Sequence, residues 1–265
     1  MEVLRAQEPL AFHSRLPEWL DLIHAIDEPH IRIKRLPTHE LNEDLRQFIE
    51  DLVPHAPSLL GIVGQGLADN HQHRADALEV FASNELWGSL AAEIGYGEQE
   101  LEFFTSAFMQ PIVHGLAGLA AKKNTEGKSV QHGLADIGVS AERSPAQKCP
   151  TCGHLPIVGI LEDEPNRLGR RRLLCSLCSN AWPFPRLTCA GCLESDAEKL
   201  QNHVSETWTH VRIDACLNCS SYIKTIDSRK SGHAEPIVDE LASLELDLWA
   251  DEQGLRKLKR NLLGF

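Results

Sequence analysis

All eight cysteines of the chain lie in four Cys-x-x-Cys pairs, and this pattern constrains the fold more than any other feature. Twenty-two residues separate the first pair from the second, and 23 separate the third from the fourth. The unit therefore repeats at an offset of 40 residues, from Cys149 to Cys189. Because four thiolates fill a tetrahedral metal site, the sequence predicts two such sites.

The near-equal loops favour pairing within each repeat. Site 1 then consists of Cys149, Cys152, Cys175 and Cys178, and site 2 of Cys189, Cys192, Cys216 and Cys219. An interleaved pairing, of the first pair with the third and the second with the fourth, stays open because spacing alone does not fix connectivity. Zinc and iron both accept four cysteine sulfurs, so the spacing leaves the metal open as well.

Composition narrows the cellular setting and the class of partner. The chain has 265 residues and a formal net charge of −12, which argues against a general nucleic-acid binder, since such proteins neutralise phosphates. The first ten residues lack the apolar run of a signal peptide, and no stretch predicts a membrane span. We therefore expect a cytoplasmic protein, in which paired cysteines are metal ligands or redox groups before they are structural disulfides.

The residues before the first cysteine predict a helical domain over 1–147. Apolar residues recur at helical spacing in several segments, which predicts a helical bundle; the segments are 16–23, 39–53, 74–94 and 98–121. The glycine-rich segment 61–66 lacks the dinucleotide-binding fingerprint and is assigned no role. Asn124–Pro145, with three glycines and a Ser-Pro, predicts a linker.

The remaining sequence predicts two tandem metal units over 148–228 and a C-terminal helix within 229–265 that packs on the rest. Strand-like segments lie between the cysteine pairs, so each repeat should form a hairpin between two Cys-x-x-Cys turns. Pro236–Arg260 is amphipathic and predicts a single helix. The predicted fold class is therefore α+β, with an N-terminal helical bundle, tandem metal units of the rubredoxin-like or zinc-ribbon type and a C-terminal helix.

Catalysis is not expected from this pattern. A metal with four protein ligands has no open position for a reactive water, and the sequence has no Ser/His/Asp or paired-carboxylate signature. We predict a protein that is not an enzyme. Two other classes stay open from the cysteines alone: a zinc-ribbon nucleic-acid-binding module and a rubredoxin-like electron-transfer protein that carries iron.

The residues around the cysteines add a more specific signal. The signature contains Cys149-Pro-Thr-Cys-Gly153, Arg172-Leu-Leu-Cys-Ser-Leu-Cys178, Cys189-Ala-Gly-Cys192, Cys216-Leu-Asn-Cys219 and the run Pro236–Asp247. Together these motifs resemble the formate dehydrogenase accessory protein family, FdhE. The resemblance covers roughly 149–254, whereas the N-terminal part agrees in length and helical character only.

The resemblance implies a cytoplasmic accessory protein with a helical N-terminal region and a rubredoxin-like metal region. Such proteins are needed for the activity of formate dehydrogenases and are thought to bind the catalytic subunit before its export. The implied cofactors are two iron ions, one in each four-cysteine site, with zinc as the alternative. The match is densest at Cys175, Ser176, Leu177 and Cys178, where we expect the partner to bind. The sequence leaves monomer and homodimer open.

Overall fold

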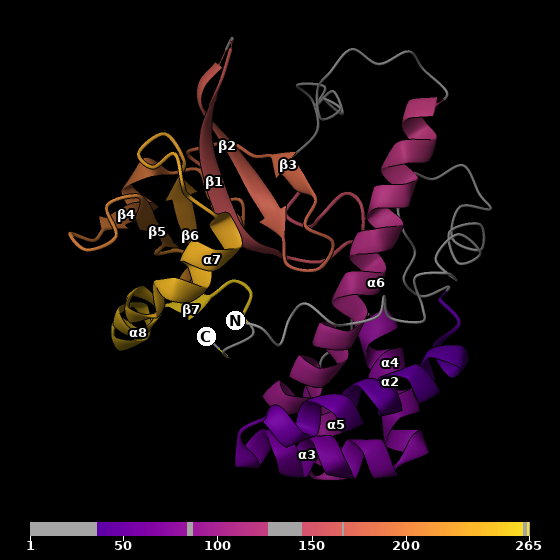
Figure 1. Ribbon diagram of the computed structural model, residues 1–265. Coiled ribbons are helices and arrows are strands. Elements are labelled where there is room, and N and C mark those ends of the chain that lie inside the picture. Colours follow the sequence, from indigo (N-terminus) through magenta and orange to yellow (C-terminus); the bar gives the residue numbers. More distant parts are fainter. Residues whose placement is uncertain (1–35, 84–86, 127–144, 166, 262–263, 265) are drawn as a thin grey trace. The chain divides into compact units, whose positions relative to one another are not determined.

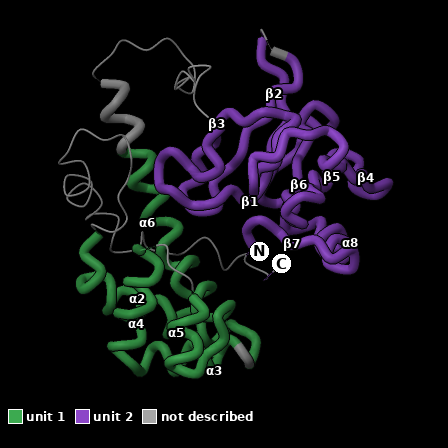
Figure 2. Tube along the Cα trace, turned by 180° about the vertical axis from the view of Figure 1, so that it is seen from behind, with its two compact units in different colours: residues 1–130 green, residues 131–265 purple. Residues whose placement is uncertain are grey.

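Residues 36–83, 87–126, 145–165, 167–261 and 264 are described by the computed structural model (Figure 1). The chain divides into unit 1, residues 1–130, and unit 2, residues 131–265 (Figure 2). Unit 1 is helical and unit 2 contains a sheet with helices, which confirms the predicted α+β class. The predicted helix at 16–23 and residues 127–144 of the predicted linker lie outside the described residues, and the predicted domain boundaries stay a prediction.

Unit 1 is built from amphipathic helices. Its elements are α2 (Thr38–Leu52), the 3-10 turn η3 (Val53–His55), α3 (Ser58–Asp69), α4 (His71–Ser83), α5 (Trp87–Ile94) and α6 (Glu98–Glu126). Side chains three or four residues apart on α2 and α6 lie on one helix face and are buried, as the apolar spacing predicts. The most buried of them are Leu41, Leu45, Ile49, Leu101, Phe104, Ile112 and Leu116.

The glycine-rich segment forms part of α3, a helix that the sequence analysis missed. A Cβ atom on Gly64 would lie 2.7 Å from both Phe104 Cζ and Val53 Cγ2. Glycine at this position therefore lets α3 approach α6 closely. The carboxyl end of α3 receives the buried Arg74 side chain, whose Nη1 donates to the Leu67 carbonyl at 3.2 Å.

One seven-stranded sheet, in the order β3-β2-β1-β6-β5-β4 with β7 beside β6, organises unit 2. Its strands are β1 (Pro156–Glu164), β2 (Arg167–Cys175), β3 (Ala181–Pro183), β4 (Leu200–Val204), β5 (Val211–Cys216), β6 (Ser221–Asp227) and β7 (Arg256–Lys257). Each repeat contains the expected antiparallel hairpin, β1/β2 in the first and β4/β5 in the second. A parallel pairing of β1 with β6 joins the two repeats into one sheet, which the sequence did not predict.

The prediction of one helix over Pro236–Arg260 is wrong, because the segment forms two short helices and a strand. The helices are α7 (Pro236–Ala242) and α8 (Leu244–Glu252). Between them Ser243 leaves the helical conformation, and its hydroxyl donates to the Asp239 carbonyl at 2.6 Å. After α8, Gly254 has a φ of +72° and ends the helix, so that the chain continues into β7.

Both C-terminal helices pack on the sheet of their own unit. Helix α7 contacts β1 and β6. On α8, Ala250 is fully buried against Ile213, Ala215 and Tyr222 of the sheet. The apolar side of the C-terminal segment is therefore covered only in part, since Ile237 and Leu248 are 40% and 47% exposed.

A buried group of four charged side chains fixes these helices to the sheet. Lys224 of β6 places Nζ 2.7 Å from Asp247 Oδ2 and 3.3 Å from Glu240 Oε1. Lys257 of β7 pairs with the same two carboxylates and lies 2.9 Å from Asp247 Oδ1. The two positive and two negative charges balance, and all four side chains are at most 3% exposed. Tyr222 completes the group by donating to Asp247 Oδ1 at 2.8 Å.

Within the described ranges, no helix combines the length and the apolar character that crossing a membrane requires.

The buried charges predict the stability of two lysine variants. Lys224→Met leaves two buried carboxylates with one lysine, and we expect it to lower the free energy of unfolding by about 3–5 kcal/mol. Lys230→Met removes an exposed lysine and should change it by less than about 0.5 kcal/mol. Urea unfolding followed by tryptophan fluorescence measures both. Similar values for the two variants would contradict a structural role for the charge group.

Candidate metal centres

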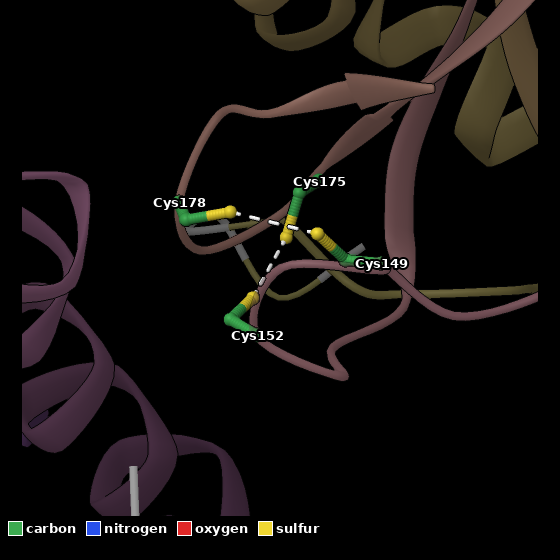
Figure 3. A group of neighbouring side chains, drawn as sticks. All are labelled: Cys149, Cys152, Cys175 and Cys178. Carbon is green, nitrogen blue, oxygen red and sulfur yellow. Dashed lines mark hydrogen bonds between the residues drawn. The ribbon is translucent and has the colours of Figure 1, made fainter. Parts of the chain in front are cut away.

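Site 1 lies at one end of the β1/β2 hairpin. Cys149 and Cys152 are on the turn before β1, Cys175 is the last residue of β2, and Cys178 follows in the next turn. Their sulfurs point toward one another (Figure 3), with Sγ–Sγ distances of 3.6 Å for Cys149–Cys178 and 3.4 Å for Cys152–Cys175. All four cysteines are buried.

Site 2 repeats this arrangement with more solvent access. Cys189 and Cys192 are on a turn between β3 and β4, Cys216 ends β5, and Cys219 lies in the turn before β6. The Sγ–Sγ distances are 3.7 Å for Cys189–Cys219 and 3.7 Å for Cys192–Cys216. Cys192 and Cys219 are half-buried. The described cysteines thus group within each repeat and not across the repeats.

The spacing of the sulfurs fits a tetrahedral metal ion. In each cluster the four sulfurs lie within 4.8 Å of one another. A zinc–sulfur bond of about 2.3 Å places tetrahedral ligands about 3.8 Å apart, close to the distances of 3.4 to 3.7 Å found here. A disulfide would need about 2.05 Å, and all eight cysteines are free. The two four-cysteine clusters can therefore hold two metal ions.

The backbone of the four turns also repeats. The residue after the second cysteine of every pair adopts a positive φ, which turns the chain back; these residues are Gly153, Ser179, Leu193 and Ser220. In three turns a backbone N–H also donates to the first sulfur of the pair: Thr151 to Cys149 at 3.4 Å, Leu177 to Cys175 at 3.4 Å and Gly191 to Cys189 at 3.2 Å. Such N–H groups favour the thiolate form that binds metal.

The thiols of site 1 influence one another's ionisation. Hydrogen bonds from the other three thiols, led by Cys152, lower the pKa of Cys149, and the same interaction raises the pKa of Cys152. Hydrogen bonds within the cluster also leave the pKa of Cys175 lowered and that of Cys178 raised, so site 1 favours a mixture of thiolates and neutral neighbours. A bound cation would remove the cost of ionising those neighbours.

The thiols of site 2 differ in their pKa values. Burial raises the pKa of Cys189 to about 12. Burial also acts to raise the pKa of Cys192, but hydrogen bonds from the Asn218 side chain and the Glu194 backbone lower it to about 7. Cys192 is therefore the thiol of this cluster that ionises near neutral pH in the absence of metal.

The loop expected to bind a partner is largely covered. Cys175 is 1% exposed, and Leu177 and Cys178 are each 3% exposed, whereas Ser176 is half-buried. These residues belong to site 1, and their role in partner binding stays a prediction.

Three polar residues next to the sulfurs were missed from the sequence. The amides of Asn180 and Asn218 lie 3.9 Å from Cys149 Sγ and 3.6 Å from Cys192 Sγ, and Ser221 Oγ lies 2.9 Å from Cys219 Sγ. All three lie within two residues of a cysteine of a Cys-x-x-Cys pair, which is the signal that could have identified them.

Comparison with known proteins identifies both halves of the cysteine region. The family model described as "FdhE, central domain" matches residues 148–186, and "FdhE, C-terminal domain" matches residues 187–263. Each matched segment contains one complete four-cysteine cluster.

Relatives and a solved structure extend the match. A "Protein FdhE homolog" of Aquifex aeolicus is 31% identical over 263 residues, covering 97% of this chain and 86% of the relative. Another, of Haemophilus influenzae strain PittGG, is 34% identical over 109 residues, which is 41% of this chain and 35% of the relative. The crystal structure of the FdhE protein from Pseudomonas aeruginosa aligns with 99% of this chain and 82% of its own, with a TM-score of 0.59 and 22% identity, which shows a shared fold. Since the similarity to the Aquifex relative spans nearly the whole chain and both domain models match in order, the chain belongs to the FdhE family.

Proposed function

We propose that this chain is an accessory protein required for the activity of a formate dehydrogenase. The observation that carries the proposal is family membership over nearly the whole chain, with one four-cysteine cluster inside each matched family domain. In this proposal the chain binds the catalytic subunit in the cytoplasm before export. It acts by binding and not as an enzyme, because a metal with four cysteine ligands has no open position.

Each four-cysteine cluster holds one metal ion in this proposal, with iron expected and zinc as the alternative. The residues that would hold it are Cys149, Cys152, Cys175 and Cys178 at site 1 and Cys189, Cys192, Cys216 and Cys219 at site 2. When bound, the metal links two turns that are distant in sequence and adds folding free energy to a unit with a small apolar core. The proposed partner-binding loop, Cys175–Cys178, would then be shaped by the metal of site 1.

Electron transfer is a second candidate, favoured by the exposure of site 2. An iron ion with four cysteine ligands can exchange one electron, and the half-buried sulfurs of Cys192 and Cys219 would bring it near the protein surface. A colourless protein that contains only zinc would exclude this role.

Metal content is the first expected outcome. The full-length chain purified without oxygen should contain two metal ions, and Cys189→Ser/Cys192→Ser should contain one, because it disables site 2 alone. Inductively coupled plasma mass spectrometry measures both, and visible absorption separates iron from zinc. Two metal ions in the double variant, or none in the wild type, would refute the assignment of the ligands.

Partner binding gives a second expected outcome. Cys175→Ser/Cys178→Ser should lower recovery of the formate dehydrogenase catalytic subunit in co-purification by about tenfold, which corresponds to about 1.4 kcal/mol of binding free energy. Cys189→Ser/Cys192→Ser is the matched control, since it removes two ligands of site 2 and leaves every residue of the proposed loop in place. Equal recovery with wild type and the first variant would remove the loop from recognition.

The thiols of site 2 should react with an alkylating reagent at different rates in the metal-free chain. Because the pKa of Cys192 is about 7 and that of Cys189 about 12, iodoacetamide at a pH of about 7.5 should label Cys192 before Cys189. Labelling should slow as the pH falls below about 7, because the thiolate is lost there. Peptide mass spectrometry locates the label, and faster labelling of Cys189 would contradict the electrostatic description of site 2.

A further inference from the structure

Arg171 has a buried guanidinium that joins the first repeat to segments next to the second four-cysteine cluster. It belongs to β2, the strand that ends at Cys175 of site 1, and it is 3% exposed. Its Nη1 donates to the Thr188 carbonyl at 3.0 Å and to the Pro185 carbonyl at 3.2 Å. Its Nη2 lies 3.1 Å from Asp214 Oδ2. A residue of the first repeat is therefore bonded to two segments of the second.

Those two segments carry the two halves of site 2. Thr188 immediately precedes Cys189, and Asp214 lies two residues before Cys216 on β5. One guanidinium thus connects the turn that bears one cysteine pair to the strand that bears the other. A shift of Arg171 would change the separation of Cys189 and Cys216.

The carboxylate that faces Arg171 is itself fixed in place. Asp214 Oδ2 accepts a hydrogen bond from Thr225 Oγ1 at 2.8 Å, and Oδ1 lies 2.7 Å from Arg212 Nε. Thr225 is on β6, which pairs with β1 of the first repeat. Asp214 is therefore held by strands that contact both repeats.

A second contact joins the repeats next to the first cysteine pair of site 1. Gln147, two residues before Cys149, donates from Nε2 to the Gly191 carbonyl. Gly191 lies inside the Cys189–Cys192 turn, and its N–H donates to Cys189 Sγ at 3.2 Å. Segments adjoining both cysteine pairs of site 1 therefore contact the same turn of site 2.

Only arginine offers the donors that this position uses. The planar guanidinium presents five N–H groups in a fixed fork, so it reaches two carbonyls and a carboxylate at once. Lysine keeps the charge but has one rotating ammonium on a flexible stem and cannot hold three separate segments in one geometry.

We propose that Arg171 is a positioning residue that couples the two metal centres, so that site 2 reaches its full metal affinity only when site 1 is loaded. The proposal rests on metal binding by both clusters. Ordering of the first repeat by its metal fixes β2 and therefore Arg171, which holds Thr188 and Asp214 at the separation that site 2 needs. Because such coupling is reciprocal, a loaded site 2 must strengthen site 1 by the same factor.

The test measures the zinc affinity of site 2 alone in the full-length chain. Reduced, metal-free protein is equilibrated with buffered free zinc, and protection of Cys192 from iodoacetamide reports occupancy of site 2. Four proteins form a double-mutant cycle: wild type, Arg171→Lys, the site 1 variant Cys149→Ser/Cys152→Ser, and the combined variant. Arg170→Lys is the matched control, since Arg170 is on the same strand and pairs with Glu164 of β1.

We expect Arg171→Lys and the site 1 variant each to weaken zinc binding at site 2 by about tenfold or more, within the usual range of coupling. The combined variant should bind no more weakly than the weaker of the two, because both changes remove the same support. Arg170→Lys should bind as wild type does. If Arg171→Lys does not fold, Asp214→Asn replaces it in the cycle, because it removes the charge that faces Arg171.

Two results would overturn the proposal in different ways. If Cys192 is protected equally in wild type and in the site 1 variant, or if the two losses multiply in the combined variant, the centres are independent although both bind metal. If zinc never protects Cys192 in wild type, site 2 binds no zinc, and both the zinc alternative at site 2 and the coupling fail.

Discussion

The parallel pairing of β1 with β6 is the interaction on which the rest of unit 2 depends. It aligns Val158 with Lys224 and Leu161 with Asp227, and so joins a strand of the first repeat to a strand of the second. Gly159 permits it, because a Cβ atom there would lie 2.4 Å from Thr225 Oγ1. The pairing turns two hairpins into one sheet, with the four-cysteine clusters in the turns that the strands connect.

Buried charged side chains then hold the two repeats against each other and α8 against the sheet. Arg171 and Asp214 join the two repeats, and Lys224 and Asp247 join the sheet to α8. Each of these charges is largely buried and has an opposite charge within hydrogen-bonding distance, so none is left uncompensated. A buried pair of this kind is satisfied in one arrangement only, which restricts the ways in which short strands and helices can pack.

The sequence predicted the features that depend on local periodicity. Apolar spacing predicted α2 and most of α6, and the cysteine repeat predicted both hairpins and the grouping of the sulfurs within repeats. It missed α3, because Gly64 weakens the helical pattern while serving a contact with Phe104. It also missed the break at Ser243, which is stabilised by contacts with Lys224 on another element. The parallel strand pair and the role of Arg171 depend on partners far along the chain, which spacing does not reveal.

X-ray absorption at the metal edge of the full-length chain, purified without oxygen, tests the central claim most directly. The account predicts that every bound metal ion has four sulfur neighbours, at about 2.3 Å if the metal is zinc, and no nitrogen or oxygen neighbour. The eight cysteines then account for two complete shells. A shell that contains nitrogen or oxygen, or fewer than four sulfurs per metal ion, would contradict the two closed four-cysteine centres.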